Sequence, residues 1–195
     1  MSGSPITAKD DEGVKAMRRV SVVGSSGSGK STLARRLSSI LGAPYTELDA
    51  LFWGPEWTEA SGDELGERVS RAIAGDAWIV DGNYRNQIGA LVWERADTVV
   101  WVNPPKPVVM WRVLIRTVRR IVTREELWNG NRERWSSLMF WRGDDSILHW
   151  AWTSYAPLQQ RYEAAMVDPA NVHLAFHRLR SSRDVERFLD KLAHD

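Results

Sequence analysis

The sequence has no cysteine among its 195 residues, which excludes disulfide bonds and thiolate metal sites. It also has almost no net charge, because 26 Lys and Arg residues balance 25 Asp and Glu residues to leave +1. That balance disfavours a general binder of nucleic acid or of membrane surfaces. No apolar run approaches the length of a membrane span, and the N-terminus lacks the apolar core of a signal peptide. We therefore expect a cytoplasmic protein without a membrane partner.

The length of the chain is typical of one domain that can bury a substantial core. Residues 1–16 are polar and carry glycine, serine and a mixed charge cluster, so we expect a flexible N-terminal tail there. Residues 17–195 then form a single domain. The 11 tryptophans are many for this length, and we expect some to lie in the core and others to form a binding surface.

The strongest motif is the run Gly24-Ser25-Ser26-Gly27-Ser28-Gly29-Lys30-Ser31, which fits the phosphate-binding pattern Gly-x-x-x-x-Gly-Lys-Ser/Thr without deviation. An apolar run over 19–23 predicts a strand before it, and periodic apolar residues over 31–41 predict a helix after it. That order directs successive backbone N–H groups and the positive end of a helix towards a polyphosphate. The sequence therefore predicts a nucleoside-triphosphate site, with ATP as the expected nucleotide.

Each residue type in this motif has a physical task. The glycines let the backbone turn inward without Cβ clashes. Lys30 is expected to reach the outer phosphates, and Ser31 to offer its hydroxyl to Mg²⁺. The residues expected to contact the nucleotide in this loop are Gly24, Ser25, Gly27, Ser28, Gly29, Lys30, Ser31 and Thr32.

Five short apolar runs, rich in β-branched and aromatic residues, predict strands that are buried on both faces. They cover residues 19–23, 45–48, 78–80, 98–102 and 172–176. Helical patterns lie between them, one beginning with a capping box of Ser61 and Glu64 and the last capped by Ser182. The alternation predicts the α/β class, as a P-loop NTPase fold of three α/β/α layers around a five-stranded parallel sheet.

Ligands of such sheets bind at the carboxyl ends of the strands, where two aspartates stand out. Asp81 follows the third predicted strand, and an apolar strand that ends in Asp beside a phosphate loop is typical of a Mg²⁺ carboxylate. Asp49 follows the second predicted strand. Three roles stay open for Asp49: a second group near Mg²⁺, a base for an acceptor hydroxyl, or a turn residue.

A helix predicted over 105–122 carries Arg112, Arg116 and Arg119 on one face, with Arg120 beside them. Like charges on one face are unfavourable unless an anion meets them, and planar guanidiniums suit the charge of a transferring phosphoryl group. A nucleic-acid face is an alternative that the near-zero net charge disfavours. The other alternative is a solvated face whose arginines pair with Glu125, Glu126 and Glu133.

Together these residues resemble the P-loop kinases of the adenylate-kinase, or nucleoside-monophosphate-kinase, type from about residue 18 to residue 192. Segments 48–57 and 78–84 are similar to a subfamily of adenylate-kinase-like "DNA topology modulation" proteins. The resemblance implies a sheet of the nucleoside-monophosphate-kinase type. It also implies a helical, arginine-rich lid over about residues 116–145.

The resemblance implies roles for individual residues as well. Asp81-Gly82-Asn83-Tyr84-Arg85 is similar to the Asp-Gly-aromatic-Pro-Arg of these kinases, although the proline is missing here. By that match Asp81 serves Mg²⁺ and its water, and Arg85 contacts the phosphate of the acceptor or the transferring phosphate. Residues 177–181, which include Arg180, fall where such kinases hold the adenine. The lid arginines match Arg116, Arg119 and Arg120.

From these features we expect a Mg²⁺-ATP-dependent phosphotransferase that acts on a small molecule, first of all a nucleoside monophosphate. One alternative is a kinase of a sugar or another hydroxyl compound, because Trp53 and Trp57 follow the second strand and aromatic faces suit sugar rings. The other is a regulator that binds ATP without catalysis. The catalytic candidates are Lys30, Asp49, Arg85, Arg116, Arg119 and Arg120.

Overall fold

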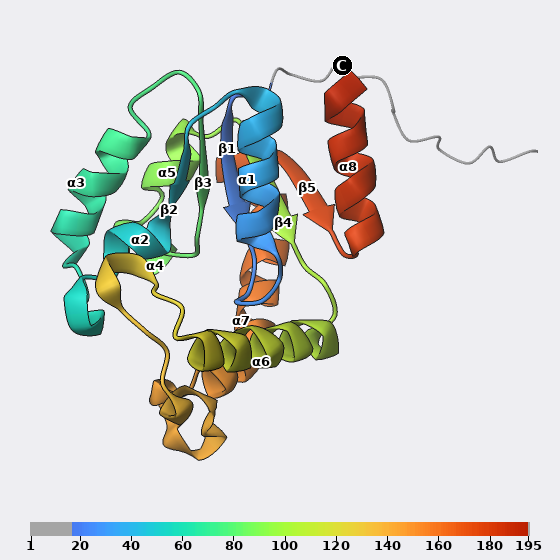
Figure 1. The fold of residues 1–195 in the computed structure, drawn as a ribbon. Coiled ribbons are helices and arrows are strands. Elements are labelled where there is room, and N and C mark those ends of the chain that lie inside the picture. Colours follow the sequence, from blue (N-terminus) through green and yellow to red (C-terminus); the bar gives the residue numbers. More distant parts are fainter. Residues whose placement is uncertain (1–16, 195) are drawn as a thin grey trace, which may run out of the picture.

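The computed structural model describes residues 17–194, except the side chains of residues 142, 144 and 145. The tail expected over residues 1–16 lies outside the described part. The centre of the molecule is a five-stranded sheet in the order β2-β3-β1-β4-β5 (Figure 1), in which all neighbouring strands run parallel. The strands are β1 Arg19–Val23, β2 Tyr45–Glu47, β3 Trp78–Asp81, β4 Thr98–Val102 and β5 Ala175–Leu179.

The three inner strands β3, β1 and β4 are buried almost throughout, as their apolar sequences predict. The register pairs Val22 of β1 with Asp81 of β3 and with Val100 of β4. The carboxyl ends of these strands therefore meet at one edge of the sheet, where the phosphate loop begins.

Helices cover both faces of the sheet, which gives the expected three layers. The helices are α1 Lys30–Leu41, α2 Leu48–Phe52, α3 Gly62–Ala72, α4 Arg85–Ile88, α5 Leu91–Arg95, α6 Lys106–Thr123, α7 Ile147–Val167 and α8 Ser182–His194. The short 3₁₀ turns are η1 Pro55–Trp57, η2 Trp128–Gly130, η3 Trp135–Leu138, η4 Phe140–Asp145 and η5 Pro169–Asn171. On one face, α1 and α8 bury Leu33, Leu37 and Leu189 against the sheet. On the other, Leu65 of α3 and Tyr162 of α7 join the core.

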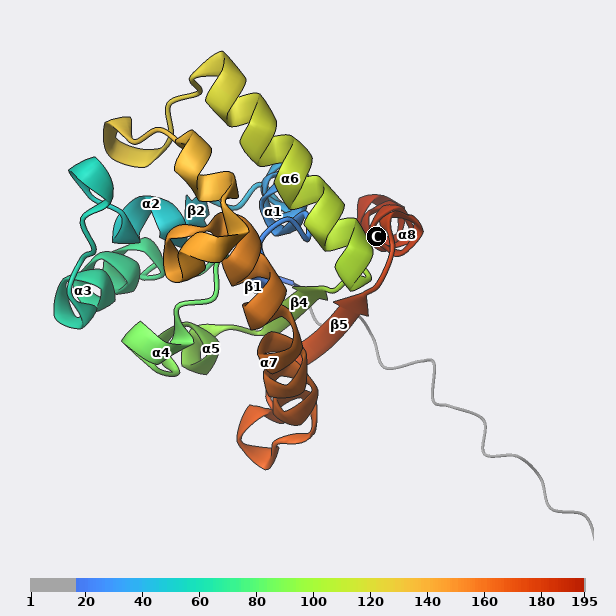
Figure 2. The ribbon, with the colours of Figure 1, turned by 90° about the horizontal axis from the view of Figure 1, so that it is seen from below.

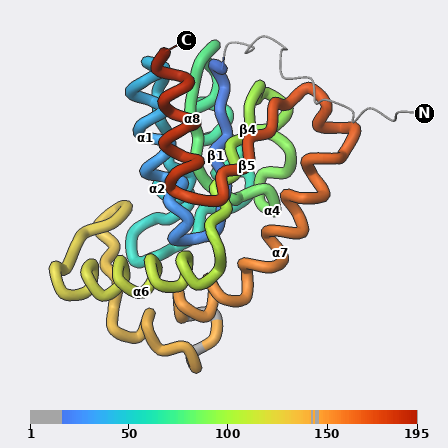
Figure 3. Tube along the Cα trace, turned by 90° about the vertical axis from the view of Figure 1, so that its right-hand side faces the viewer, coloured from blue at the N-terminus to red at the C-terminus, as the bar shows by residue number. Residues whose placement is uncertain are grey.

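Helix α6 belongs to neither layer. It lies across the carboxyl edge of the sheet, beneath the loop that joins β1 to α1 (Figures 1 and 2). The segment after α6 turns back below it, and α7 then rises beside the sheet (Figure 3). No helix among residues 17–194 is long and apolar enough to cross a membrane.

Several element boundaries differ from the sequence prediction. The fifth strand was predicted over 172–176, but Val172 is 88% exposed and β5 begins at Ala175, which pairs with Thr98. The prediction favoured the apolar residues and missed Arg178, whose charge fits in the strand because it stacks on the Trp101 ring, 4.1 Å from the centroid.

Two smaller differences concern helix starts. The second strand ends at Glu47, and Asp49 lies in the helix α2 rather than directly after the strand. The last helix is capped by Ser181, not by Ser182, because the Ser181 hydroxyl accepts a hydrogen bond from the Asp184 N–H. The capping box of Ser61 and Glu64 is confirmed.

Candidate active site

The loop between β1 and α1 has the backbone shape that its glycines predict. Gly24, Gly27 and Gly29 adopt positive φ angles of 151°, 78° and 101°, which other residues reach only with strain. A Cβ on Gly24 would lie 2.4 Å from the Val102 carbonyl oxygen, and a Cβ on Gly27 would lie 2.5 Å from a Val113 methyl carbon. The loop is therefore packed so tightly against β4 and α6 that glycine is required at both positions.

The start of α1 fits an anion. No described side chain caps this helix, and its first turn has no acidic residue, so its first N–H groups and positive dipole end are available. The Ser28 hydroxyl is buried without a hydrogen-bond partner among the described residues. Within the same part of the chain Lys30 makes no hydrogen bond or ion pair to another side chain. A bound polyphosphate would supply a hydrogen-bond acceptor to the Ser28 hydroxyl and negative charge to Lys30.

The expected Mg²⁺ residues lie together. The Ser31 hydroxyl donates a hydrogen bond to the Asp81 carboxylate, and the Tyr45 hydroxyl donates another at 3.1 Å. Asp81 is only 1% exposed, and this burial raises the pKa of its carboxyl, while nearby Lys30 opposes the shift. A hydroxyl and a carboxylate are oxygen ligands that suit Mg²⁺, which keeps several waters and phosphate oxygens as its other ligands.

Asn83 holds the beginning of the loop, and the sequence analysis did not single it out. Its side-chain oxygen accepts a hydrogen bond from the Gly24 N–H at 3.2 Å, and its amide nitrogen donates to the Gly24 carbonyl at 2.6 Å. The Tyr162 hydroxyl donates to the same oxygen at 2.7 Å. The available signal was the position of Asn83 two residues after a strand-end aspartate, at the edge where β1 also ends.

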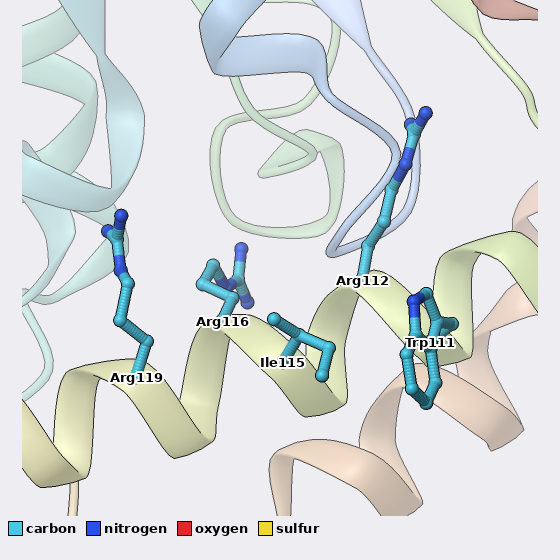
Figure 4. A pocket seen from close by; sticks show the side chains of 5 residues that line it. All are labelled: Trp111, Arg112, Ile115, Arg116 and Arg119. Carbon is cyan, nitrogen blue, oxygen red and sulfur yellow. The ribbon is translucent and has the colours of Figure 1, made fainter.

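Two arginines of α6 reach the phosphate loop. Arg112 donates a hydrogen bond to the Ser28 carbonyl at 3.0 Å, and Arg116 donates to the Ser26 hydroxyl at 2.9 Å. Arg112 also donates to the Ser182 hydroxyl at 3.2 Å. Figure 4 shows Arg112 extending from α6 alongside the loop. The structure thus places Arg112, as well as Arg116, in contact with the loop of residues 24–31.

A cavity of about 340 Å³ opens on this side of α6. Its lining is Trp111, Arg112, Ile115, Arg116 and Arg119 (Figure 4). Burial, followed by the proximity of Arg120, lowers the pKa of Arg116. A guanidinium held in a partly buried position beside another cation is poised to gain from an incoming anion.

The other two expected arginines are already ion-paired. Arg119 contacts Glu125 at 2.9 Å, and Arg120 contacts Glu133 at 3.0 Å. For these two, the structure matches the alternative of an arginine face neutralised by glutamates. The third glutamate of that alternative, Glu126, lies 3.5 Å from Arg132 instead.

Asp49 lies in α2, the short helix that follows β2. It accepts a hydrogen bond from the Tyr84 hydroxyl at 2.7 Å. Burial and the Asp49 charge raise the pKa of Tyr84 well above its usual value, so this hydroxyl stays a donor at neutral pH. Glu47 is close by, and burial followed by the Asp81 and Asp49 charges raises its pKa. Carboxylates therefore gather at the ends of β2 and β3.

The remaining expected residues occupy separate places. Arg85 lies over the Trp93 ring, 4.8 Å from its centroid. Thr32 is exposed in the first turn of α1, and Ser25 is buried and accepts a hydrogen bond from the Ser28 N–H. Arg180 is exposed after β5, and its backbone N–H donates to Asp184 at 3.0 Å.

Comparison with solved structures supports the fold. No protein-family model matches the chain, and no curated protein matches it. A gluconokinase from Sinorhizobium meliloti matches with a TM-score of 0.50 and 19% identity, covering 93% of this chain and 96% of its own. Shikimate kinase from Acinetobacter baumannii, in complex with shikimate, matches with a TM-score of 0.50 and 14% identity over 90% of each chain. A sugar kinase from a Janibacter species has a TM-score of 0.48 and 21% identity, over 89% of this chain and 93% of its own. At these identities the likeness concerns the fold alone, an α/β fold that the chain shares with the gluconokinase and the shikimate kinase.

Proposed function

We propose that this chain is a Mg²⁺-dependent phosphotransferase that moves the terminal phosphoryl group of ATP to a small molecule. The observation that carries the proposal is the loop of residues 24–31, with its glycine φ angles and with Lys30 beside Asp81 and unpaired among the described residues. In this proposal residues 17–195 form one kinase domain, and about residues 116–145 form its lid.

The residues around the loop then have distinct tasks. The loop N–H groups and Lys30 hold the outer phosphates, while Ser31 and Asp81 hold Mg²⁺. When bound, the metal ion would neutralise charge that develops on the phosphate oxygens. Arg116 stabilises the transferring group from the side of α6, and Arg112 fixes the loop through Ser28. Little covalent chemistry is required of the protein, because positioning and charge stabilisation supply the rate.

The acceptor that fits this geometry best is a hydroxyl compound. Asp49 lies in α2, two residues after β2 ends. Within the described part of the chain its carboxylate accepts one hydrogen bond, from Tyr84, which leaves carboxylate lone pairs for a substrate. In the transfer step, the acceptor oxygen bonds to the terminal phosphorus, the bond to the bridging oxygen breaks, and ADP leaves. Asp49 takes the proton that the hydroxyl loses.

A nucleoside monophosphate is the second candidate, and the motif that ends in Arg85 favours it. An acceptor phosphate needs a cation, and Arg85 lies on Trp93 rather than in an ion pair within the described part of the chain. Arg119 and Arg120 are already neutralised by glutamates. The phosphate acceptor thus relies on Arg85, whereas the hydroxyl acceptor relies on Asp49.

The test is a coupled assay of ADP release with Mg²⁺-ATP and a panel of nucleoside monophosphates, sugars, polyols and amino-alcohols. We expect stimulation by a hydroxyl compound and a loss of at least about a hundredfold in Lys30→Ala. Thermal stabilisation by ATP checks binding separately, and the unfolding temperature without ligand checks that the variant folds. ATP binding with turnover that no acceptor raises would support a non-catalytic regulator instead.

A further inference from the structure

Two turns that are distant in the sequence are hydrogen-bonded to each other beside the candidate acceptor site. One is the acceptor-side turn, residues 53–58, which follows α2. The other is the α6-exit turn, residues 127–131. Asn131 accepts a hydrogen bond from the Trp57 N–H at 2.8 Å and donates one to the Gly54 carbonyl at 2.8 Å. Asn129 donates to the Trp53 carbonyl at 2.5 Å. These bonds join residues that are 74 to 77 positions apart.

Both turns contain backbone strain. Trp57 has a φ angle of 59° and Asn129 has one of 55°, and left-handed conformations cost non-glycine residues about 1–3 kcal/mol each. Each turn also closes on itself, through the Gly54 N–H to the Thr58 carbonyl and the Leu127 N–H to the Asn131 carbonyl, both at 2.7 Å. Strained turns persist where their surroundings hold them, and here each turn is held by the other.

Asn131 is the centre of this contact. It is 3% exposed, and its side-chain nitrogen also donates to the Trp128 carbonyl at 2.9 Å. A buried amide whose oxygen and nitrogen are both used is hard to replace, because any change leaves polar groups without partners. Asn131 therefore fixes the position of one turn on the other.

The contact extends to the candidate acceptor site. The Trp57 and Trp128 rings meet edge to face, with 6.4 Å between their centroids. The Trp128 side chain lies close enough to the Glu47 carboxylate to lower the pKa of Glu47, against the stronger effect of burial. Glu47 ends β2, and Asp49 follows two residues later. The α6-exit turn thus touches the segment that carries the candidate base.

The same turn is connected to the phosphate loop through α6. Arg112 and Arg116 bond the loop from the middle of this helix, which ends at Thr123. Helices transmit displacement as stiff elements. A continuous physical path therefore runs from the loop through α6 and the α6-exit turn to the acceptor-side turn.

We propose that Asn131 is a positioning residue that joins the two turns, so that a nucleotide in the phosphate loop orders the acceptor-side turn. Binding of the nucleotide then strengthens binding of the acceptor, because the acceptor-side turn is already ordered when the acceptor binds. The inference rests on the proposed function, because it requires a nucleotide in the loop.

The test is hydrogen exchange of the full chain, followed by mass spectrometry, with and without Mg²⁺ and a non-hydrolysable ATP analogue. In the wild type we expect the analogue to slow exchange over residues 24–32 and, by about tenfold, over residues 53–60. In Asn131→Ala we expect the first response to remain and the second to fall to within about twofold of the ligand-free rate.

The control variant is Asn171→Ala, which removes another buried asparagine with a hydrogen bond, here to the Ala165 carbonyl at 2.9 Å. It should lower stability while keeping both responses. Asn129→Ala removes one exposed contact and should weaken the second response only in part.

The outcomes separate the two proposals. Protection of 24–32 without protection of 53–60 in the wild type, or an unchanged 53–60 response in Asn131→Ala, would overturn the coupling alone. No protection of 24–32 by the analogue would overturn the nucleotide site and the coupling together.

Discussion

The phosphate loop and the acceptor-side turn lie on the same edge of the sheet, but they are held in different ways. The loop is eight consecutive residues, 24–31, whose shape follows from glycines at positive φ between a buried strand and a helix. The acceptor-side turn is held by Asn129 and Asn131, which come 74 or more residues later. The first region is fixed locally, whereas the second depends on a contact that only the folded chain creates. Variants in the two regions should therefore fail in different ways.

The largest expected effect separates acceptor chemistry from nucleotide binding. Asp49→Asn should lower turnover with a hydroxyl acceptor by about 10²- to 10⁴-fold, the usual range for a general base. The affinity for Mg²⁺-ATP should change little, because Asp49 contacts Tyr84 and not the loop. Steady-state kinetics with the stimulating acceptor measure the turnover. Calorimetric titration with the non-hydrolysable ATP analogue measures the affinity for nucleotide.

Arg85→Ala is the matched variant for the competing acceptor. For a hydroxyl acceptor it should affect turnover much less than Asp49→Asn, because Arg85 stacks on Trp93. The reverse order, with a small effect of Asp49→Asn and a large one of Arg85→Ala, would assign a phosphate acceptor.

A second effect distinguishes the arginines that α6 presents to the loop. Arg116→Ala should lower turnover by about a hundredfold, as loss of one donor to a developing negative charge does. Arg119→Ala should have a smaller effect, because Glu125 already neutralises Arg119 at 2.9 Å. Turnover numbers of the two variants at saturating ATP decide this, and equal losses would contradict the role of the Ser26 contact of Arg116.

The third expected effect concerns Asn83, which contacts the phosphate loop but lies outside the motif of residues 24–31. Asn83→Ala removes both hydrogen bonds to Gly24, each worth about 1 kcal/mol net, so affinity for Mg²⁺-ATP should fall by up to about thirtyfold. Tyr162→Phe removes only the bond that orients Asn83 and should have a smaller effect. Titration of the ATP analogue measures both, and an unchanged affinity in Asn83→Ala would exclude Asn83 from loop positioning.

The sequence predicted the locally determined parts of the molecule well. A five-stranded parallel sheet was expected and is confirmed, because buried strands and helices alternate with clear periodicity. Ser31 and Asp81 were expected together, and they are hydrogen-bonded. Strand five was misplaced because apolar content was the only signal, whereas the cation of Arg178 is accommodated by Trp101 from the neighbouring strand.

Apart from the pair of Ser31 and Asp81, which two motifs marked, the sequence did not predict contacts between remote segments. The resemblance placed Arg119 and Arg120 among the lid arginines, but whether glutamates neutralise them depends on how the chain after α6 folds back. The position of Asn83 after a strand-end aspartate gave only a weak signal, and Asn131 gave none, because their partners are backbone groups 59 and 77 residues away. Backbone groups are present at every position, so no residue pattern marks which of them an asparagine will bind.

The smallest expected effect concerns stability and pH rather than catalysis. Burial raises the pKa of Asp81, so its protonated form is favoured in the folded state. The contribution of the Asp81 carboxyl to the free energy of unfolding is therefore fully stabilising below the ordinary carboxyl pKa of about 3.9. This stabilisation is lost as the pH rises through the folded-state pKa. At neutral pH the ionised carboxylate lowers the free energy of unfolding of the ligand-free protein. Asp81→Asn removes this charge and keeps polar partners for Ser31 and Tyr45.

Without Mg²⁺ or nucleotide, Asp81→Asn should unfold at a temperature about 2–4 °C above the wild type at pH 7 for each kcal/mol gained. The difference should shrink as the pH falls through the folded-state pKa of Asp81 towards the ordinary carboxyl value of about 3.9, because the wild-type carboxyl becomes protonated too. The exposed Asp76 offers the control variant Asp76→Asn, which should unfold with the wild type at both pH values. With Mg²⁺ and the ATP analogue the order should reverse, because only the wild type gains a metal ligand from this position. A lower unfolding temperature for ligand-free Asp81→Asn at pH 7 would mean that the attraction between the Asp81 carboxylate and Lys30 outweighs the cost of burying that carboxylate. The charge of Asp81 would then already be compensated by Lys30 before the metal ion binds.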